Sequence, residues 1–241
     1  MSGVWTVFRK EFRLYFNSPI AYILLALFTA FCAWWFFFFT PFFIIDQAET
    51  RYLFGVLPFV FLFLVPAVAM RLWAEEKKLG TIELLLTLPL RDGEIVLGKY
   101  LAALAFLAVA LALTFTIPVS VAWLGDPDMG PIWGSYVGSL LLAGAYLAIG
   151  SFASAITRDQ IIAFVVGLSC CTALYLVGIA ASNSGILPAS ISHFLAFLGL
   201  STHFESISRG VIDTRDVIYY LSVISFFLYL TALVLRRVRK G

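Results

Sequence analysis

Six long stretches without a charged residue constrain the fold of this sequence more than any other feature. They cover residues 19–45, 52–70, 100–125, 129–157, 160–204 and 217–235. An α-helix needs about 20 predominantly apolar residues to cross the hydrocarbon core of a bilayer. Charged residues make up only 12% of the chain and its mean hydropathy is +0.99, whereas about 25% of a typical soluble domain is charged. The sequence therefore predicts an all-α integral membrane protein.

The fifth stretch is long enough for two spans, but polar and helix-breaking residues interrupt its second part: Ser182, Asn183, Ser184, Gly185, Pro188, Ser190, Ser192 and His193. We therefore predict one span near residues 161–181, followed by an outer segment over 182–216 that holds one or two short helices. The other spans are predicted near residues 20–45, 52–72, 100–124, 132–156 and 217–235. Six transmembrane helices thus form a single domain over residues 1–241.

Residues 4–17 precede the first span and have the pattern of an amphipathic helix. Apolar and aromatic side chains recur at helical spacing and would form one face: Val4, Trp5, Phe8, Phe12, Tyr15 and Phe16. The opposite face would carry Thr6, Arg9, Lys10 and Arg13. A helix of this kind lies in the plane of the membrane interface, with its cations at the headgroups. A frayed juxtamembrane tail is the alternative.

Lysine and arginine residues indicate the orientation, because cytoplasmic loops carry an excess of them. An N-terminus in the cytoplasm places 13 basic residues inside: Arg9, Lys10, Arg13, Arg71, Lys77, Lys78, Arg91, Lys99, Arg158, Arg236, Arg237, Arg239 and Lys240. Only Arg51, Arg209 and Arg215 then lie outside. We therefore expect both termini to be cytoplasmic. Since these residues act as topology anchors, the net charge of +2 does not indicate a nucleic-acid partner.

The predicted span cores lack the ionisable residues that ion-coupled carriers and intramembrane enzymes need. Glu75 and Glu76 are adjacent carboxylates, but they fall at the cytoplasmic end of a span. His193 and His203 fall on the outer side, about a membrane thickness away, and catalytic partners must approach within hydrogen-bond distance. A secondary carrier and an enzyme are therefore both disfavoured.

Two other patterns also indicate no cofactor or metal site. Residues 93–99 match GxxxxGK, but Tyr100 stands where a phosphate loop needs Ser or Thr. Cys32, Cys170 and Cys171 lie inside predicted spans and are expected to be small core residues. We therefore predict that this chain binds no ATP itself.

The longest charged interruption is residues 74–99, AEEKKLGTIELLLTLPLRDGEIVLGK. Its expected landmarks are a charged helix end over 75–78, a stop at Gly80, an N-cap at Thr81, a leucine-rich helix ended by Pro89, and Asp92 as the cap of the next helix. A short helix made mostly of leucine is costly to leave in water. It must pack against the bundle, the membrane surface or another protein.

This loop resembles the cytoplasmic loop of ATP-binding-cassette (ABC) exporter permeases of the type-2 family. The shared pattern is EEKKxGTxExLLxxPxxxxExxxGK, over residues 75–99. The closest likeness is to the subgroup of gliding-motility and nitrous-oxide-reductase-maturation permeases. Residues 204–213, FESISRGVID, also resemble the gliding-motility type. The resemblance covers essentially the whole chain.

The resemblance implies a permease subunit in a bacterial inner membrane that pairs with a second copy or a homologous permease. Each permease would dock a separate ATPase subunit, which binds ATP and Mg²⁺, through the loop between the second and third spans. A periplasmic accessory protein and membrane lipid are further expected partners. The residues that match the coupling region are Glu75, Glu76, Lys77, Lys78, Gly80, Thr81, Glu83, Leu84, Leu85, Leu86 and Pro89.

Two alternatives stay open at this point. The leucines of residues 84–86 would have no coupling role if they only pack beneath the bundle. The whole chain would be a non-transporting scaffold or mechanotransducer if it passes ATPase motion to a periplasmic partner.

The basic bias predicts a labelling experiment. In a background without native cysteines, Ala48→Cys is expected to react with a membrane-impermeant thiol reagent added from outside, and Asp92→Cys is expected not to react. The reverse pattern would overturn the orientation.

Overall fold

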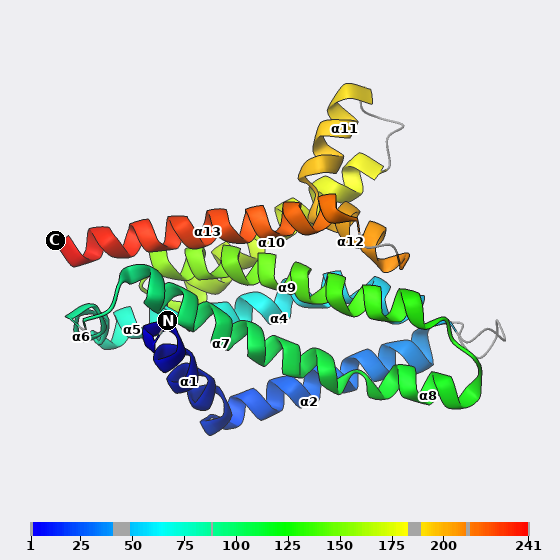
Figure 1. The fold of residues 1–241 in the computed structure, drawn as a ribbon, viewed down its shortest axis with the longest axis horizontal. Coiled ribbons are helices and arrows are strands. Elements are labelled where there is room, and N and C mark those ends of the chain that lie inside the picture. The colour runs from blue at the N-terminus through cyan, green and yellow to red at the C-terminus, as the bar shows by residue number, and fades with distance from the viewer. Residues whose placement is uncertain (1, 41–48, 88, 183–188, 211–212, 241) are drawn as a thin grey trace.

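The computed structural model describes residues 2–40, 49–87, 89–182, 189–210 and 213–240. The regular elements within these ranges are all helices (Figure 1). They are α1 (Ser2–Asn17), α2 (Pro19–Trp34), the π-helix η1 (Trp35–Phe39), α4 (Arg51–Ala69), α5 (Ala74–Leu79), α6 (Ile82–Thr87), α7 (Asp92–Leu113), α8 (Thr116–Leu124), α9 (Met129–Ile156), α10 (Gln160–Ser182), α11 (Ala189–Leu198), α12 (Leu200–Ser208) and α13 (Thr214–Lys240). The predicted all-α fold is confirmed.

Within the described residues, six helical segments are long and apolar enough to cross a membrane, in agreement with the predicted number. They are Pro19–Phe39, Arg51–Leu79, Asp92–Leu124, Met129–Ile156, Gln160–Ala180 and Thr214–Arg239. Helix α7 alone has 22 residues, a length of about 33 Å, which matches the roughly 30 Å hydrocarbon core. Residues 41–45 of the predicted first span lie outside the described residues.

The chain path brings both termini and the charged loop to the same end of the bundle. Figure 1 shows α1, α5, α6 and the C-terminal end of α13 together at that end, and α8 and α12 at the other. This arrangement agrees with an even number of crossings. The elements that carry most of the basic residues therefore gather on one side.

Helix α9 is the centre of the bundle and packs against α4, α7, α10, α12 and α13. In its most apolar window 78% of the residues are buried, against 28%, 22% and 17% in the first, fifth and sixth spans. Small residues permit this close packing, as is usual between helices in lipid. A Cβ added at Gly150 would lie 2.5 Å from the Ala69 Cβ of α4, and one at Gly144 would lie 2.9 Å from the Tyr100 hydroxyl of α7.

The third span, predicted near residues 100–124, contains a short break within its helical segment. Helix α7 ends at Leu113 and α8 begins at Thr116. The cause is Pro118, which has no N–H to bond the carbonyl of Thr114 four residues earlier. That carbonyl accepts instead from the Ile117 N–H at 3.0 Å, a tighter turn.

Helix α1 is a formed helix that packs along α7, and not a frayed tail. The two helices cross closely at Gly98, where an added Cβ would lie 2.7 Å from the Val7 Cβ. The buried face contains Gly3 and Val7. Trp5, which the sequence placed on the apolar face, is 62% exposed. Trp5 therefore does not pack against the bundle, and its predicted place at the acyl boundary stays a prediction.

The outer segment contains two short helices, α11 and α12, and a polar contact fastens α12 to α13. The Nδ1 atom of His203 lies 2.7 Å from Asp216 Oδ1, and its Nε2 atom lies 3.0 Å from the Phe197 carbonyl oxygen. The imidazole also stacks on Tyr219 with ring centroids 4.0 Å apart. The side chain of His193 lies outside the described residues.

The packing of α9 predicts opposite effects for two glycine-to-alanine changes. Gly150→Ala is expected to destabilise the protein by about 1–3 kcal/mol, because the added methyl group overpacks the contact with α4. Gly55→Ala is the matched control, since nothing lies within 4 Å of a Cβ added there. It is expected to stabilise by about 0.5–1 kcal/mol through reduced chain entropy. Denaturant unfolding of the purified variants measures both, and equal midpoints would contradict the packing argument.

Candidate functional site

The charged loop forms two short helices joined by a left-handed glycine. Helix α5 ends at Gly80, whose φ is +70°, a backbone conformation that only glycine adopts readily. The Thr81 N–H donates to the Glu76 carbonyl at 3.0 Å and so satisfies an orphan acceptor of the helix end. The predicted stop at Gly80 is confirmed. Thr81 directly precedes α6, at the position predicted for an N-cap. Its hydroxyl, however, donates to the Glu76 carbonyl oxygen of the preceding helix at 3.4 Å.

A turn over residues 70–73 joins α4 to α5, and the end of α9 holds this turn in place. Ser154 Oγ accepts from the backbone N–H groups of Trp73 and Ala74 at 3.1 and 3.0 Å, and donates to the Met70 carbonyl at 2.9 Å. The indole N–H of Trp73 donates to Ser151 Oγ at 3.0 Å. Trp73 is fully buried. The start of α5 is therefore anchored to the central helix by both backbone and side-chain bonds.

Lys99 is a buried cation that joins three elements. Only 3% of its side chain is exposed. Its ammonium lies 2.8 Å from Glu76 Oε1 of α5, 3.4 Å from Glu11 Oε1 of α1, and 3.0 Å from the Leu72 carbonyl. The ammonium donates hydrogen bonds to Glu76 and to the Leu72 carbonyl, and Glu11 adds an ion pair. The Trp73 ring adds a cation–π contact at 5.2 Å to its centroid.

The surroundings of Lys99 also bear on whether the GxxxxGK sequence of residues 93–99 forms a phosphate loop. Residues 93–99 form the first turns of α7, and the Lys99 ammonium is already occupied by protein acceptors. A phosphate loop needs a glycine-rich turn with free backbone N–H groups and a free lysine. The segment is therefore the start of a helix and does not have the conformation of a phosphate loop.

The matched coupling residues divide into two groups by direction, and the first group faces inward. Glu76 bonds Lys99, and Lys77 Nζ donates to the Ala155 carbonyl at the end of α9. Glu75 lies 4.0 Å from Arg71 and is partly exposed. In α6, Leu85 is 7% exposed and belongs to the hydrophobic core. These residues connect the loop to the bundle.

The second group faces outward. It consists of the exposed Lys78, Gly80, Thr81, Glu83 and Pro89. Between them stands Leu79, which is 68% exposed. The side chains of Leu84 and Leu86 lie outside the described residues. The loop thus presents a solvent-facing surface, which we call the α5–α6 surface, formed by Leu79 and the five residues named above.

The predicted cap at Asp92 is wrong, because α7 begins at Asp92 and Arg91 occupies the capping position. The reason is Glu94, whose Oε2 atom accepts from the Arg91 backbone N–H at 3.0 Å. The Asp92 carboxylate instead contacts the end of α13, 3.0 Å from Arg239 and 3.6 Å from Arg236. A cysteine at the exposed Lys78 is therefore a cleaner topology probe than one at Asp92.

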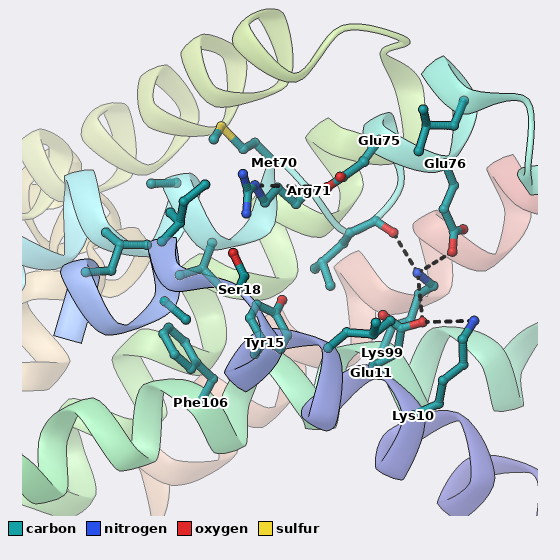
Figure 2. A pocket seen from close by; sticks show the side chains of 18 residues that line it. Lys10, Glu11, Tyr15, Ser18, Met70, Arg71, Glu75, Glu76, Lys99 and Phe106 are labelled. Carbon is teal, nitrogen blue, oxygen red and sulfur yellow. Dashed lines mark hydrogen bonds and ion pairs between the residues drawn. The ribbon is translucent and has the colours of Figure 1, made fainter.

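A cavity of about 590 Å³ opens beside the Lys99 cluster (Figure 2). Residues of α1, α2, α5, α7 and the end of α4 line it. One part of its wall is charged, with Lys10, Glu11, Arg71, Glu75 and Glu76, and another part is apolar. No group of three or more His, Cys, Asp or Glu side chains suited to a metal ion occurs within the described residues.

Sequence reasoning missed Glu11, Ser151 and Ser154. Glu11 follows Val7 by four residues, so the two share a helix face. An acid on the buried face of an otherwise basic helix is a signal that a cation lies opposite. Ser151 and Ser154 looked like ordinary small packing residues, and no local pattern marks them as partners of a turn 80 residues earlier.

Residues 5–237 match the model of a family described as ABC-2 family transporter protein. The matched range includes nearly all of α1, the first five candidate spans, nearly all of the sixth and both loop helices. No curated protein matches the chain.

The Lys99 cluster predicts a large stability loss when the cation is removed. Lys99→Met leaves the largely buried Glu76 carboxylate without its ion-pair partner and Glu11 with only the more distant Lys10. Breaking a buried ion pair in this way typically costs about 3–5 kcal/mol. Lys78→Met removes the same charge from an exposed position and is expected to change stability by less than about 0.5 kcal/mol. Chemical unfolding in detergent measures the difference.

A second variant separates charge from packing. Adding Glu11→Gln and Glu76→Gln to Lys99→Met is expected to recover part of the loss, because no unpaired charge then remains. Identical unfolding midpoints for Lys99→Met and Lys78→Met would contradict a structural role for the cluster.

Proposed function

The chain belongs to the ABC-2 transporter family, and we propose that it is the membrane subunit of an exporter driven by a separate ATPase. It is a multi-pass membrane protein and the permease component of an ABC transporter. Permeases of this family lack a nucleotide-binding domain of their own, and the family implies an ABC ATPase partner. Export as the direction of transport, and the gliding-motility or nitrous-oxide-reductase-maturation subgroup, rest on the resemblance of residues 75–99 and 204–213.

The observation that carries this proposal is the division of residues 75–89 into an outward and an inward group. The α5–α6 surface exposes Leu79 among polar and charged neighbours, which suits the apolar centre and polar rim of a protein contact. Directly behind it, Glu76 and Lys77 are bonded to α7 and α9. A force applied by an ATPase at this surface would therefore act on the spans without an intervening flexible joint.

The orientation follows from the same contact. An ATPase that consumes cytoplasmic ATP must meet the α5–α6 surface in the cytoplasm, so α1, the end of α13 and this surface face inward. The basic residues gathered at that end favour the same assignment by the positive-inside rule. The location is then a bacterial inner membrane, with α11 and α12 on the periplasmic side.

The working assembly is proposed to be a dimer of permeases with two ATPase subunits, in contact with membrane lipid. The alternative is a scaffold that passes ATPase motion to a periplasmic accessory protein. One observation supports this alternative. Phe194 and Phe197 of α11 are each 63% exposed on a helix pair that His203 and Asp216 fasten to α13. Substrate-dependent stimulation of ATP hydrolysis in the reconstituted complex would favour transport over this alternative.

The docking role of the α5–α6 surface predicts the effect of Leu79→Asp. Placing a carboxylate in the apolar centre of the contact is expected to reduce the binding free energy of the complex by about 2 kcal/mol or more. This loss corresponds to roughly 30-fold weaker binding. The ATPase is expected to dissociate during co-purification, while the permease still inserts and unfolds at its normal midpoint. The isolated permease is expected to hydrolyse no ATP in any variant.

Two controls separate contact from folding. Leu124→Asp changes a leucine of similar exposure, 65%, in α8 at the other end of the bundle, and is expected to retain the ATPase. Leu85→Asp places charge in the core of this chain and is expected to destabilise the permease itself. Full ATPase retention by Leu79→Asp, with normal coupled activity, would exclude this surface as the docking site.

A further inference from the structure

The cavity beside the Lys99 cluster contains polar groups that the coupling argument does not use. Arg71 reaches it from the end of α4, and its one ion-pair partner among the described residues is Glu75, at 4.0 Å. Lys10 reaches it from α1 with 60% of its side chain exposed. Lys10 lies 3.8 Å from Glu11, so each of the two cations has one carboxylate at the long end of the ion-pair range and has further donors for an anion.

Hydroxyl groups point into the same space. Figure 2 shows the hydroxyls of Tyr15 and Ser18 turned toward Arg71. Burial, with Glu11 nearby, raises the pKa of the Tyr15 phenol, so this group stays a hydrogen-bond donor. Ser18 directly precedes α2, yet its side chain makes no capping hydrogen bond. The positive end of the 16-residue helix α2 also lies at the cavity, through Ser18 and Ile20.

Glu11, Glu75, Glu76 and Lys99 also line the cavity, and another part of its wall is apolar and continues onto the outside of the bundle. Leu24, Ala67 and Val68 line its inner wall. Leu14 and Ile20 also line it and are 51% and 44% exposed, and Ile23 and Leu27 continue the exposed apolar face along α2. The charged end of the cavity lies at the end of the spans, at the depth of headgroups, and its apolar side faces the hydrocarbon layer.

We propose that this cavity binds the phosphate group of a glycerophospholipid, with the acyl chains lying along α2. Arg71 would hold the phosphate, because a guanidinium forms paired charge-assisted hydrogen bonds to phosphate oxygens. Tyr15 and Ser18 would donate to the remaining oxygens, and Lys10 would supply a second positive charge. The volume of about 590 Å³ is within the range of roughly 300–1,000 Å³ that ligand sites commonly have.

Because the cavity wall has both a charged and an apolar part, we expect it to bind a lipid more tightly than a soluble phosphate. A phosphate in water would gain only the polar contacts, whereas a lipid also covers Leu14 and Ile20. The inference depends on membrane embedding and not on the ATPase. Arg71 would then lie between the lipid phosphate and Glu75 of the proposed coupling loop, while Lys10 and Tyr15 of α1 contact the same phosphate, and so the lipid would link that loop to the interfacial helix.

The test measures binding of three probes to the purified permease by native mass spectrometry. They are phosphatidylglycerol, diacylglycerol with the same acyl chains, and glycerol 3-phosphate. Wild-type protein is expected to retain phosphatidylglycerol at least tenfold more tightly than either of the others. Arg71→Gln is expected to weaken that binding about tenfold or more, since it removes the paired hydrogen bonds.

The matched control is Arg13→Gln, which removes the same charge from an exposed position of α1 that does not line the cavity. It is expected to leave binding within about twofold. Ala67→Phe fills the apolar part without changing charge and is expected to weaken phosphatidylglycerol binding while leaving the unfolding midpoint unchanged.

Three results would overturn the proposal. Equal losses in Arg71→Gln and Arg13→Gln would indicate non-specific attraction to a basic surface. Equal binding of diacylglycerol would exclude a role for phosphate, and equal binding of glycerol 3-phosphate would indicate a soluble ligand. Because no ATPase is present, each of these outcomes is distinct from a failure of the proposed coupling function.

Discussion

The buried ammonium of Lys99 is the interaction on which the rest of this end of the structure depends. A cation with 3% exposure is tolerated only if its charge and all of its donors are satisfied. Its partners come from α1, from α5 and from the turn before α5, so these elements must hold their positions together. The cost of burying one charge therefore fixes the mutual placement of the interfacial helix, the loop and the third span.

A second consequence concerns how motion could pass from the loop to the spans. Helix α5 is bonded to α7 through Glu76 and to the end of α9 through Lys77 and Trp73. Helix α9 in turn contacts most of the bundle. Small side chains at Gly150, Ser151 and Ser154 let α4 approach closely enough for these bonds to form. The bonds between the loop and the bundle thus depend on the same small residues that permit close helix packing.

Much of the fold could be predicted because the controlling property is local. A charge-free stretch of about 20 residues has few alternatives to a membrane-spanning helix, and the positive φ of Gly80 follows from a glycine between two helical patterns. The break after Leu113 was also visible in principle, since Pro118 removes a backbone donor. A continuous apolar composition concealed it.

The direction of individual side chains in the loop could not be predicted, because it depends on contacts distant in sequence. Glu76, Lys77 and Lys78 are consecutive and all charged, yet two of them bond the bundle and the third is exposed. What separates them is the position of Lys99 and of the Ala155 carbonyl, which lie 23 and 78 residues away. A charged flank is therefore ambiguous, because the same residue types both bond the bundle and form an exposed surface. In this chain the two uses occur on opposite sides of one short helix, so the surface proposed to receive force and the bonds that would transmit it are only one residue apart.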